Sequence, residues 1–289
     1  MVTFRGALTQ GTQLLTDAGI QGARKEAQVL LGAVVEMDKA HLIAYAEREL
    51  TPEQEHLYTA WLDRRKQHEP VAYILGHEEF YGLDFLVDCR VLIPRPETEL
   101  LVETALGHIR SWLSAGKTPV VADIGTGSGA IPITIAVEEP RLPLIYACDI
   151  SPDALDVARL NIARHHVGER IQTLAGDLIS PLPEPVDLLL ANLPYVGTTE
   201  VDVMEADVLD FEPHLALFSG PQGLDVLQRF CEAVQHSAVL KSGGVMLLEI
   251  GYQQGAPLVQ LLQKLWPQAL VTCQKDFAGW DRLVQVQLG

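Results

Sequence analysis

The sequence predicts an α/β protein whose main part is a doubly wound, mostly parallel, seven-stranded sheet, preceded by a small helical domain and a bridging β-hairpin. Three patterns lead to this expectation. From residue 118 onward, short apolar runs alternate with helical patterns, as in a parallel sheet covered by helices. Before residue 68, apolar residues recur only at helical spacing. The last two apolar runs can pair antiparallel at one edge.

The composition indicates a folded protein without a membrane segment. The chain has 289 residues, of which 48% are hydrophobic, and this suits one large domain or a large and a small one. No apolar stretch is long enough to cross a bilayer and no secretory signal is evident, so a cytoplasmic location is expected. The four cysteines include no Cys-x-x-Cys pair, so no metal is expected.

The charge balance bears on the class of substrate. Asp and Glu total 38 against 21 Lys and Arg, which gives a formal net charge of −17. Binding to a phosphate backbone depends on cationic side chains. The sequence therefore favours a protein or small-molecule substrate, and no direct nucleic-acid binding is expected.

Three segments follow from these patterns. We expect a helical bundle over residues 1–76, a β-hairpin linker over residues 77–92, and the sheet domain over residues 93–289. In the first segment, Thr51-Pro52-Glu53-Gln54 predicts a helix start, because Thr can cap the helix, Pro fits its first position and Gln completes a capping box. In the third, two prolines stiffen residues 93–99, which lead into a helix that ends near Ile109.

Seven apolar runs are expected to form the strands of the sheet: residues 119–124, 144–148, 171–175, 186–191, 244–250, 269–273 and 282–288. Helices are expected between several of them, including one over residues 225–240. The run 186–191 is apolar on both faces, as in a strand at the middle of a parallel sheet.

This central run ends on Asn192, followed by Leu193, Pro194 and Tyr195. Ligands of open α/β sheets bind beyond the carboxyl ends of the strands. An amide side chain held there by a stiff turn can both donate and accept hydrogen bonds, which makes Asn192 a candidate for the reaction site. The alternative is that Asn192 closes the strand and begins a turn, as Asn often does.

A nucleoside cofactor is indicated next to this strand. The first strand runs into Gly125, Thr126, Gly127, Ser128 and Gly129, and a glycine-rich turn lets a ligand approach the backbone closely. Asp149 ends the second strand, about 20 positions beyond the loop, where a carboxylate can accept both ribose hydroxyls. The glycine spacing leaves NAD possible and fits S-adenosyl-L-methionine better.

The third strand adds a possible adenine site. Asp177 follows it and can accept from the exocyclic amine, while Leu178 can cover the face of the ring. The alternative for Asp177 is a helix or turn cap.

The chain resembles the PrmC/HemK family, the release factor glutamine methyltransferases of the class I, Rossmann-like fold. The resemblance covers nearly the whole chain and includes the following segments: 70–76, 79–82, 93–99, 123–130, 212–213 with 216–217, 249–251, and 279 with 281–282. It implies that S-adenosyl-L-methionine donates a methyl group to the Gln of the Gly-Gly-Gln loop of class I peptide chain release factors, leaving S-adenosyl-L-homocysteine. It also implies that the helical segment engages the release factor.

The same resemblance suggests roles for the residues that follow the central strand. Asn192 Oδ1 and the Leu193 carbonyl would accept the two hydrogens of the substrate amide, while Pro194 stiffens the turn and Tyr195 lines the slot. Leu193 departs from the family, which has Pro at this position. A backbone carbonyl contact would survive that change, because Leu supplies the same carbonyl.

Other functions remain open at this point. The same Asn-x-Pro-Tyr geometry would serve an adenine or cytosine amino-methyltransferase, because these bases also present a planar amine. The glycine loop could belong to an NAD-dependent oxidoreductase, although no proton donor is nominated for it. A non-catalytic binding module is the third alternative. For the release factor methyltransferase, a monomer is expected.

Overall fold

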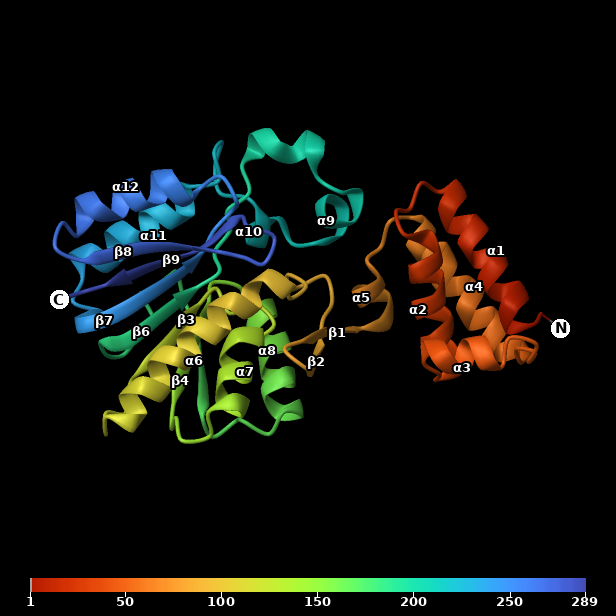
Figure 1. Cartoon of the computed structure of the whole chain (residues 1–289), viewed down its shortest axis with the longest axis horizontal. Coiled ribbons are helices and arrows are strands. Elements are labelled where there is room, and N and C mark those ends of the chain that lie inside the picture. Colours follow the sequence, from red (N-terminus) through yellow and green to blue (C-terminus); the bar gives the residue numbers. More distant parts are fainter. Residues whose placement is uncertain (1) are drawn as a thin grey trace. The chain divides into compact units, whose positions relative to one another are not determined.

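The computed structural model describes residues 2–289, apart from the side chains of residues 200, 202 and 203. The chain forms two compact units (Figure 1). The first runs to His77 and also includes Glu205–Phe211, and the second comprises Glu78–Met204 and Glu212–Gly289. Within residues 2–289, none of the helices combines the length and apolar character that a membrane span requires.

The first unit is helical, as predicted. Its helices are α1 (Phe4–Asp17), α2 (Ala23–Val35), α3 (Lys39–Ala44), α4 (Pro52–Lys66), α5 (Val71–Leu75) and α9 (Ala206–Phe211). The predicted capping box of α4 is confirmed: the Gln54 N–H donates to Thr51 Oγ1, and the Thr51 N–H donates to Gln54 Oε1. The buried Arg65 donates to Glu26 at 2.6 Å and to Asp207 at 3.2 Å, so α9 is tied to helices that lie far from it in the sequence.

The second unit contains the seven-stranded sheet and all of a two-stranded hairpin except its first residue, His77. The hairpin comprises β1 (His77–Phe80) and β2 (Leu83–Leu86). The sheet strands are β3 (Val121–Ile124), β4 (Ile145–Asp149), β5 (Ile171–Ala175), β6 (Val186–Ala191), β7 (Leu240–Glu249), β8 (Leu270–Lys275) and β9 (Asp281–Gln287). Their order is β5-β4-β3-β6-β7-β9-β8, parallel except for the two pairings of β9. The predicted fold class is confirmed.

Helices cover both faces of the sheet. On one face lie α6 (Glu99–Ser114), α7 (Ala130–Glu138) and α8 (Pro152–Arg164), and on the other lie α11 (Asp225–His236) and α12 (Gly255–Leu265) (Figure 1). Along β6, Leu188 and Leu190 pack under the first group while Leu189 and Ala191 pack under the second. This is why the strand is apolar at successive positions: a strand buried on both faces has no solvent side.

The polar exception in β6 is Asp187, which is only 2% exposed. Burial would raise the pKa of its carboxyl, but hydrogen bonds from Lys117, Lys241 and the Val120 N–H lower it below its usual value. These contacts anchor the start of β6, so that its other end is held at a defined place in the sheet.

Several element bounds differ from the prediction. The helix expected to reach residue 240 ends at His236, and β7 begins at Leu240 rather than at residue 244. The extra length follows from a register shift, since Leu240 pairs with Val186 while Val245 pairs with Leu188. The helix expected from Pro96 to about Ile109 begins as the short η1 (Pro96–Thr98) and continues as α6 to Ser114. Short helices that were not predicted are η2 (Thr198–Val203), α9 and α10 (His214–Leu217).

Candidate active site

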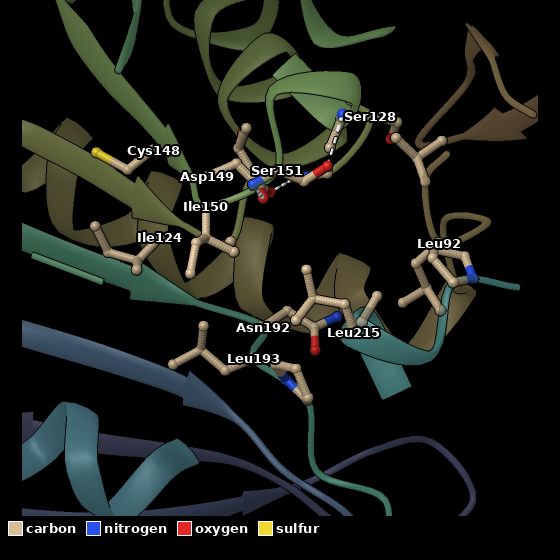
Figure 2. Close-up of a pocket in the computed structure, with 18 of the residues that line it drawn as sticks. Leu92, Ile124, Ser128, Cys148, Asp149, Ile150, Ser151, Asn192, Leu193 and Leu215 are labelled. Atoms are coloured by element: carbon tan, nitrogen blue, oxygen red, sulfur yellow. Dashed lines mark hydrogen bonds between the residues drawn. The ribbon is translucent and has the colours of Figure 1, made fainter. Parts of the chain in front are cut away.

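The carboxyl ends of β3, β4, β5 and β6 open into a cavity of about 190 Å³ (Figure 2). Because these strands are parallel, the residues that follow them gather at one edge of the sheet. Most of the predicted site residues line this cavity: Gly125, Thr126, Gly127, Ser128, Asp149, Asp177, Leu178, Asn192, Leu193 and Pro194. Gly129 and Tyr195 do not.

The glycine loop has the backbone conformation that only glycine adopts readily. Gly125, Gly127 and Gly129 have φ values of +77°, +54° and +82°, in the left-handed region. A Cβ at Gly125 would lie 3.1 Å from Leu193 Cδ2, and one at Gly129 would lie 2.9 Å from Ile133 Cδ1. The loop thus needs glycine for conformation and for close packing.

Asp149 braces this loop from the neighbouring strand. Its carboxylate accepts the N–H of Gly127 at 2.9 Å and the N–H of Ser151 at 2.9 Å. Burial raises the pKa of Asp149, and these backbone hydrogen bonds oppose the rise. Figure 2 shows Asp149, Ile150 and Ser151 on the side of the cavity opposite Asn192 and Leu193. A carboxylate here has lone pairs left for a ligand.

The predicted adenine contact has a partner within the protein. The Asp177 carboxylate accepts two hydrogen bonds from Arg229, at 2.9 and 3.1 Å, and both residues line the cavity. Leu178 beside it has a φ of +50°, which is unusual for a residue with a side chain. The pair forms a charged rim at this end of the cavity.

Asn192 lines the cavity, and a hydrogen bond to Thr98 fixes its side chain. Its Nδ2 donates to Thr98 Oγ1 at 3.1 Å. The next side chain, Leu193, is 5% exposed and packs on Gly125. The loop after β6 and the glycine loop after β3 therefore support each other.

Tyr195 turns away from the cavity. Its hydroxyl donates to Glu249 Oε1 at 3.4 Å, and its carbonyl accepts from Gln254 Nε2 at 2.8 Å. Gln254 also donates to the carbonyl of Gly223 at 3.2 Å. These contacts fix the backbone directly after the predicted reaction site.

Sequence reasoning did not single out Thr98, Asp123, Glu249 or Gln254 as site residues. Asp123 lies one residue before the end of β3 and is fully buried, and neither of its carboxylate oxygens has a hydrogen-bond partner among the residues that the structure describes. Burial raises the pKa of Asp123 to about 7, and that of Glu249 at the end of β7 also to about 7. A carboxyl at or next to the end of an apolar strand segment is a signal that could have been used, because burying such a group is costly.

Family comparison places this site in a known class. Residues 6–76 match the family model described as the PrmC N-terminal domain, and residues 98–215 match the methyltransferase small domain. A solved methyltransferase from Pyrococcus furiosus has the same fold, with a TM-score of 0.53 and 16% identity over 80% of this chain and 98% of that one. The fold and the matched domains make this protein a class I methyltransferase.

Relatives of higher identity define the branch of that class. The release factor glutamine methyltransferase of Koribacter versatilis is 40% identical over 290 residues, covering 98% of each chain. That of Moorella thermoacetica is 38% identical over 282 residues, covering 97% of each. The chain belongs to the release factor glutamine methyltransferase family, as its sequence motifs indicated. Membership implies a methyl donor of the S-adenosylmethionine type.

Proposed function

We propose that this protein transfers a methyl group to the side-chain amide nitrogen of the Gln in the Gly-Gly-Gln loop of peptide chain release factors. The observation that carries the proposal is the placement of Asn192 at the edge of the cavity, with Nδ2 engaged by Thr98. This arrangement leaves Oδ1 as the acceptor for a substrate N–H. An amide substrate needs such an acceptor, whereas hydride transfer does not.

The residues around the cavity suit S-adenosyl-L-methionine as the methyl donor. Asp149 would accept ribose hydroxyls, and Leu178 with Ile150 would cover apolar parts of the nucleoside. The Thr126 hydroxyl lines the cavity and has no hydrogen-bond partner among the described residues, so a polar group of a ligand would satisfy it. The bound cofactor supplies an electrophilic methyl group on sulfur and leaves as S-adenosyl-L-homocysteine.

The chain's own contribution is to hold the amide nitrogen. That nitrogen is a poor nucleophile, because its lone pair is delocalised into the carbonyl. Asn192 Oδ1 and the Leu193 carbonyl would accept its two hydrogens and stabilise the positive charge that grows on them as the N–C bond forms. Positioning of this kind supplies on the order of 7–11 kcal/mol at best. The displaced proton passes to water.

The helical segment 1–76 would engage the release factor, and the match of residues 6–76 to the PrmC N-terminal domain supports this role. The enzyme would act as a cytoplasmic monomer. The predicted role of Tyr195 is refined: it would fix the turn through Glu249 rather than contact the substrate, since its hydroxyl donates to that carboxyl.

The test is mass spectrometry of a release factor incubated with the protein and S-adenosyl-L-methionine. One added methyl on the Gln of its Gly-Gly-Gln loop is expected. The Asn192→Ala variant should bind S-adenosyl-L-homocysteine within about twofold of wild type, while its turnover falls on the order of 100-fold, as when one transition-state hydrogen bond is lost. An unmodified Gln, or full turnover by the variant, would refute the proposal.

A further inference from the structure

The hairpin that was predicted as a linker forms part of the cavity wall. Phe80 of β1 is 1% exposed and lines the cavity. Its ring lies 6.1 Å from that of Phe85 in β2, edge to face, and both rings belong to the apolar core that also contains Ile131 of α7. The hairpin is therefore packed into the sheet domain, where its position affects what the cavity can bind.

Asn161 of α8 connects this hairpin to the glycine loop, and β2 lies beside α8 (Figure 1). The residue is 0% exposed. Its Oδ1 accepts the Leu86 N–H at 2.7 Å, and its Nδ2 donates to the Leu86 carbonyl at 3.0 Å and to the Ser128 carbonyl at 2.9 Å. A primary amide offers an acceptor oxygen and two donor hydrogens. The oxygen and both hydrogens are thus engaged, with partners 75 and 33 positions away in the sequence.

The glycine loop packs on the same face of α8. An added Cβ at Gly129 would lie 3.4 Å from Ala158 Cβ. Ala158 is three positions before Asn161, and residues at this spacing share a helix face. Ser128 is 3% exposed and lies in the wall of the cavity (Figure 2). A shift of the hairpin at Leu86 would therefore reach the loop at Ser128 through Asn161.

The three hydrogen bonds of Asn161 make the two segments depend on each other. Because the amide is fully buried, loss of any one bond would leave a buried donor or acceptor unpaired, which is costly. The observed conformations of the hairpin and the glycine loop are therefore favoured together.

We propose that Asn161 is a positioning residue for the cofactor: by holding Leu86 and Ser128 together, it couples the order of the hairpin to the binding conformation of the glycine loop. Coupling between two sites is reciprocal. A hairpin that favours the binding conformation of the loop must itself be stabilised when the cofactor binds. This inference rests on the proposed function for its ligand, S-adenosyl-L-methionine, and adds to it a role for the hairpin and α8.

The first experiment measures cofactor affinity. Asn161→Leu keeps the approximate size of the side chain and removes all three hydrogen bonds. We expect the dissociation constant of S-adenosyl-L-homocysteine, from calorimetric titration of the full-length protein, to rise on the order of 10-fold, as is typical of coupled sites. At saturating S-adenosyl-L-methionine, kcat with a release factor should stay within about threefold of wild type.

The matched control is Arg164→Ala on the same helix. Arg164 forms an ion pair with Asp84 of the hairpin, and both side chains are exposed. The substitution removes a contact to the hairpin but leaves Asn161 in place, and an exposed ion pair contributes little to stability. The dissociation constant of this variant should stay within about twofold of wild type.

Hydrogen exchange of the wild-type protein tests the coupling from the other side, without a substitution that could unfold the chain. Saturating S-adenosyl-L-homocysteine should slow exchange of the Leu86 amide on the order of 10-fold, as reciprocity requires. The amides of β8, at the far edge of the sheet, report any general stabilisation and should change by less than about twofold.

The outcomes distinguish this inference from the proposed function. The coupling is overturned if folded Asn161→Leu binds S-adenosyl-L-homocysteine as tightly as wild type. It is also overturned if the ligand binds and exchange at Leu86 is unchanged, or slows no more than in β8. If both expected effects are seen and the release factor stays unmethylated, the coupling stands and the proposed function is refuted.

Discussion

The Asp149 carboxylate has two roles in the site. It accepts the N–H groups of Gly127 and Ser151, which sets the shape of the glycine loop and the start of α8. The same group faces the cavity, where ribose hydroxyls would be the remaining donors. Its partial desolvation makes each charge-assisted hydrogen bond stronger than it would be in water.

We expect Asp149→Ala to weaken cofactor binding more than turnover. Loss of hydrogen bonds to a charged acceptor costs about 2 kcal/mol, or roughly 30-fold in the dissociation constant. Calorimetric titration with S-adenosyl-L-homocysteine measures this change. At saturating cofactor, kcat should stay within about tenfold of wild type.

The matched control is Asp156→Ala on the exposed side of α8, where the carboxylate forms an ion pair with Arg159. Its dissociation constant should equal that of wild type. Equal affinities for Asp149→Ala and Asp156→Ala would mean that Asp149 shapes the loop without contacting the cofactor.

The loop after β6 is also held through the backbone carbonyl of Tyr195. The carbonyl of Tyr195 lies against Gly223 and accepts from Gln254. A Cβ at Gly223 would lie 2.0 Å from that carbonyl oxygen, closer than real Cβ contacts allow. The turn before α11 thus leaves room for the loop that carries Asn192.

Gly223→Ala should therefore displace the reaction loop. Gly223 has a φ of +73° and a blocked Cβ position, so we expect a loss of more than about 3 kcal/mol in the free energy of unfolding, together with reduced turnover. Gly116→Ala is the control, because Gly116 has a φ of +78° and an added Cβ would meet no atom within 4 Å. It should lose only about 1 kcal/mol, with full turnover.

Chemical denaturation and turnover assays on both variants provide the measurement. If Gly223→Ala and Gly116→Ala lose the same stability and neither loses activity, then the close approach of Gly223 to Tyr195 has no part in holding the loop.

The net charge of the molecule favours the family's protein substrate over nucleic acids, which proteins of similar fold can also bind. A class I methyltransferase fold does not by itself select a substrate. The formal net charge of −17 opposes association with a phosphate backbone, because that association depends on cationic contacts. The adenine or cytosine amino-methyltransferase alternative is thereby disfavoured, in agreement with the family relationship.

We expect no methyl transfer to DNA or RNA and no stable complex with either. At about 150 mM salt and about 10 µM protein, an electrophoretic mobility assay should show no shift. Tritium transfer from labelled S-adenosyl-L-methionine should reach the release factor alone when nucleic acid is present in excess. Label in the nucleic acid would contradict the role assigned to the charge.

Local sequence patterns predicted those parts of the structure that depend on residues close to each other in the sequence. The capping box at Thr51 and the glycine loop at residues 125–129 depend on contacts over a few positions, so they can be read directly. Strand identities were correct for the same reason, while the start of β7 was wrong because its length depends on pairing with β6. The membership of Glu205–Phe211 in the helical unit had no local signature.

By itself, the sequence determined the α/β class, the glycine loop and the polar end of a central apolar strand, because periodicity and turn chemistry act over short distances. Only the tertiary structure determined which residue contacts the Asn192 side chain. Thr98 belongs to η1, 94 positions before Asn192, and the fold brings the two side chains into hydrogen-bond contact. Such a contact is a consequence of topology, which no local pattern encodes.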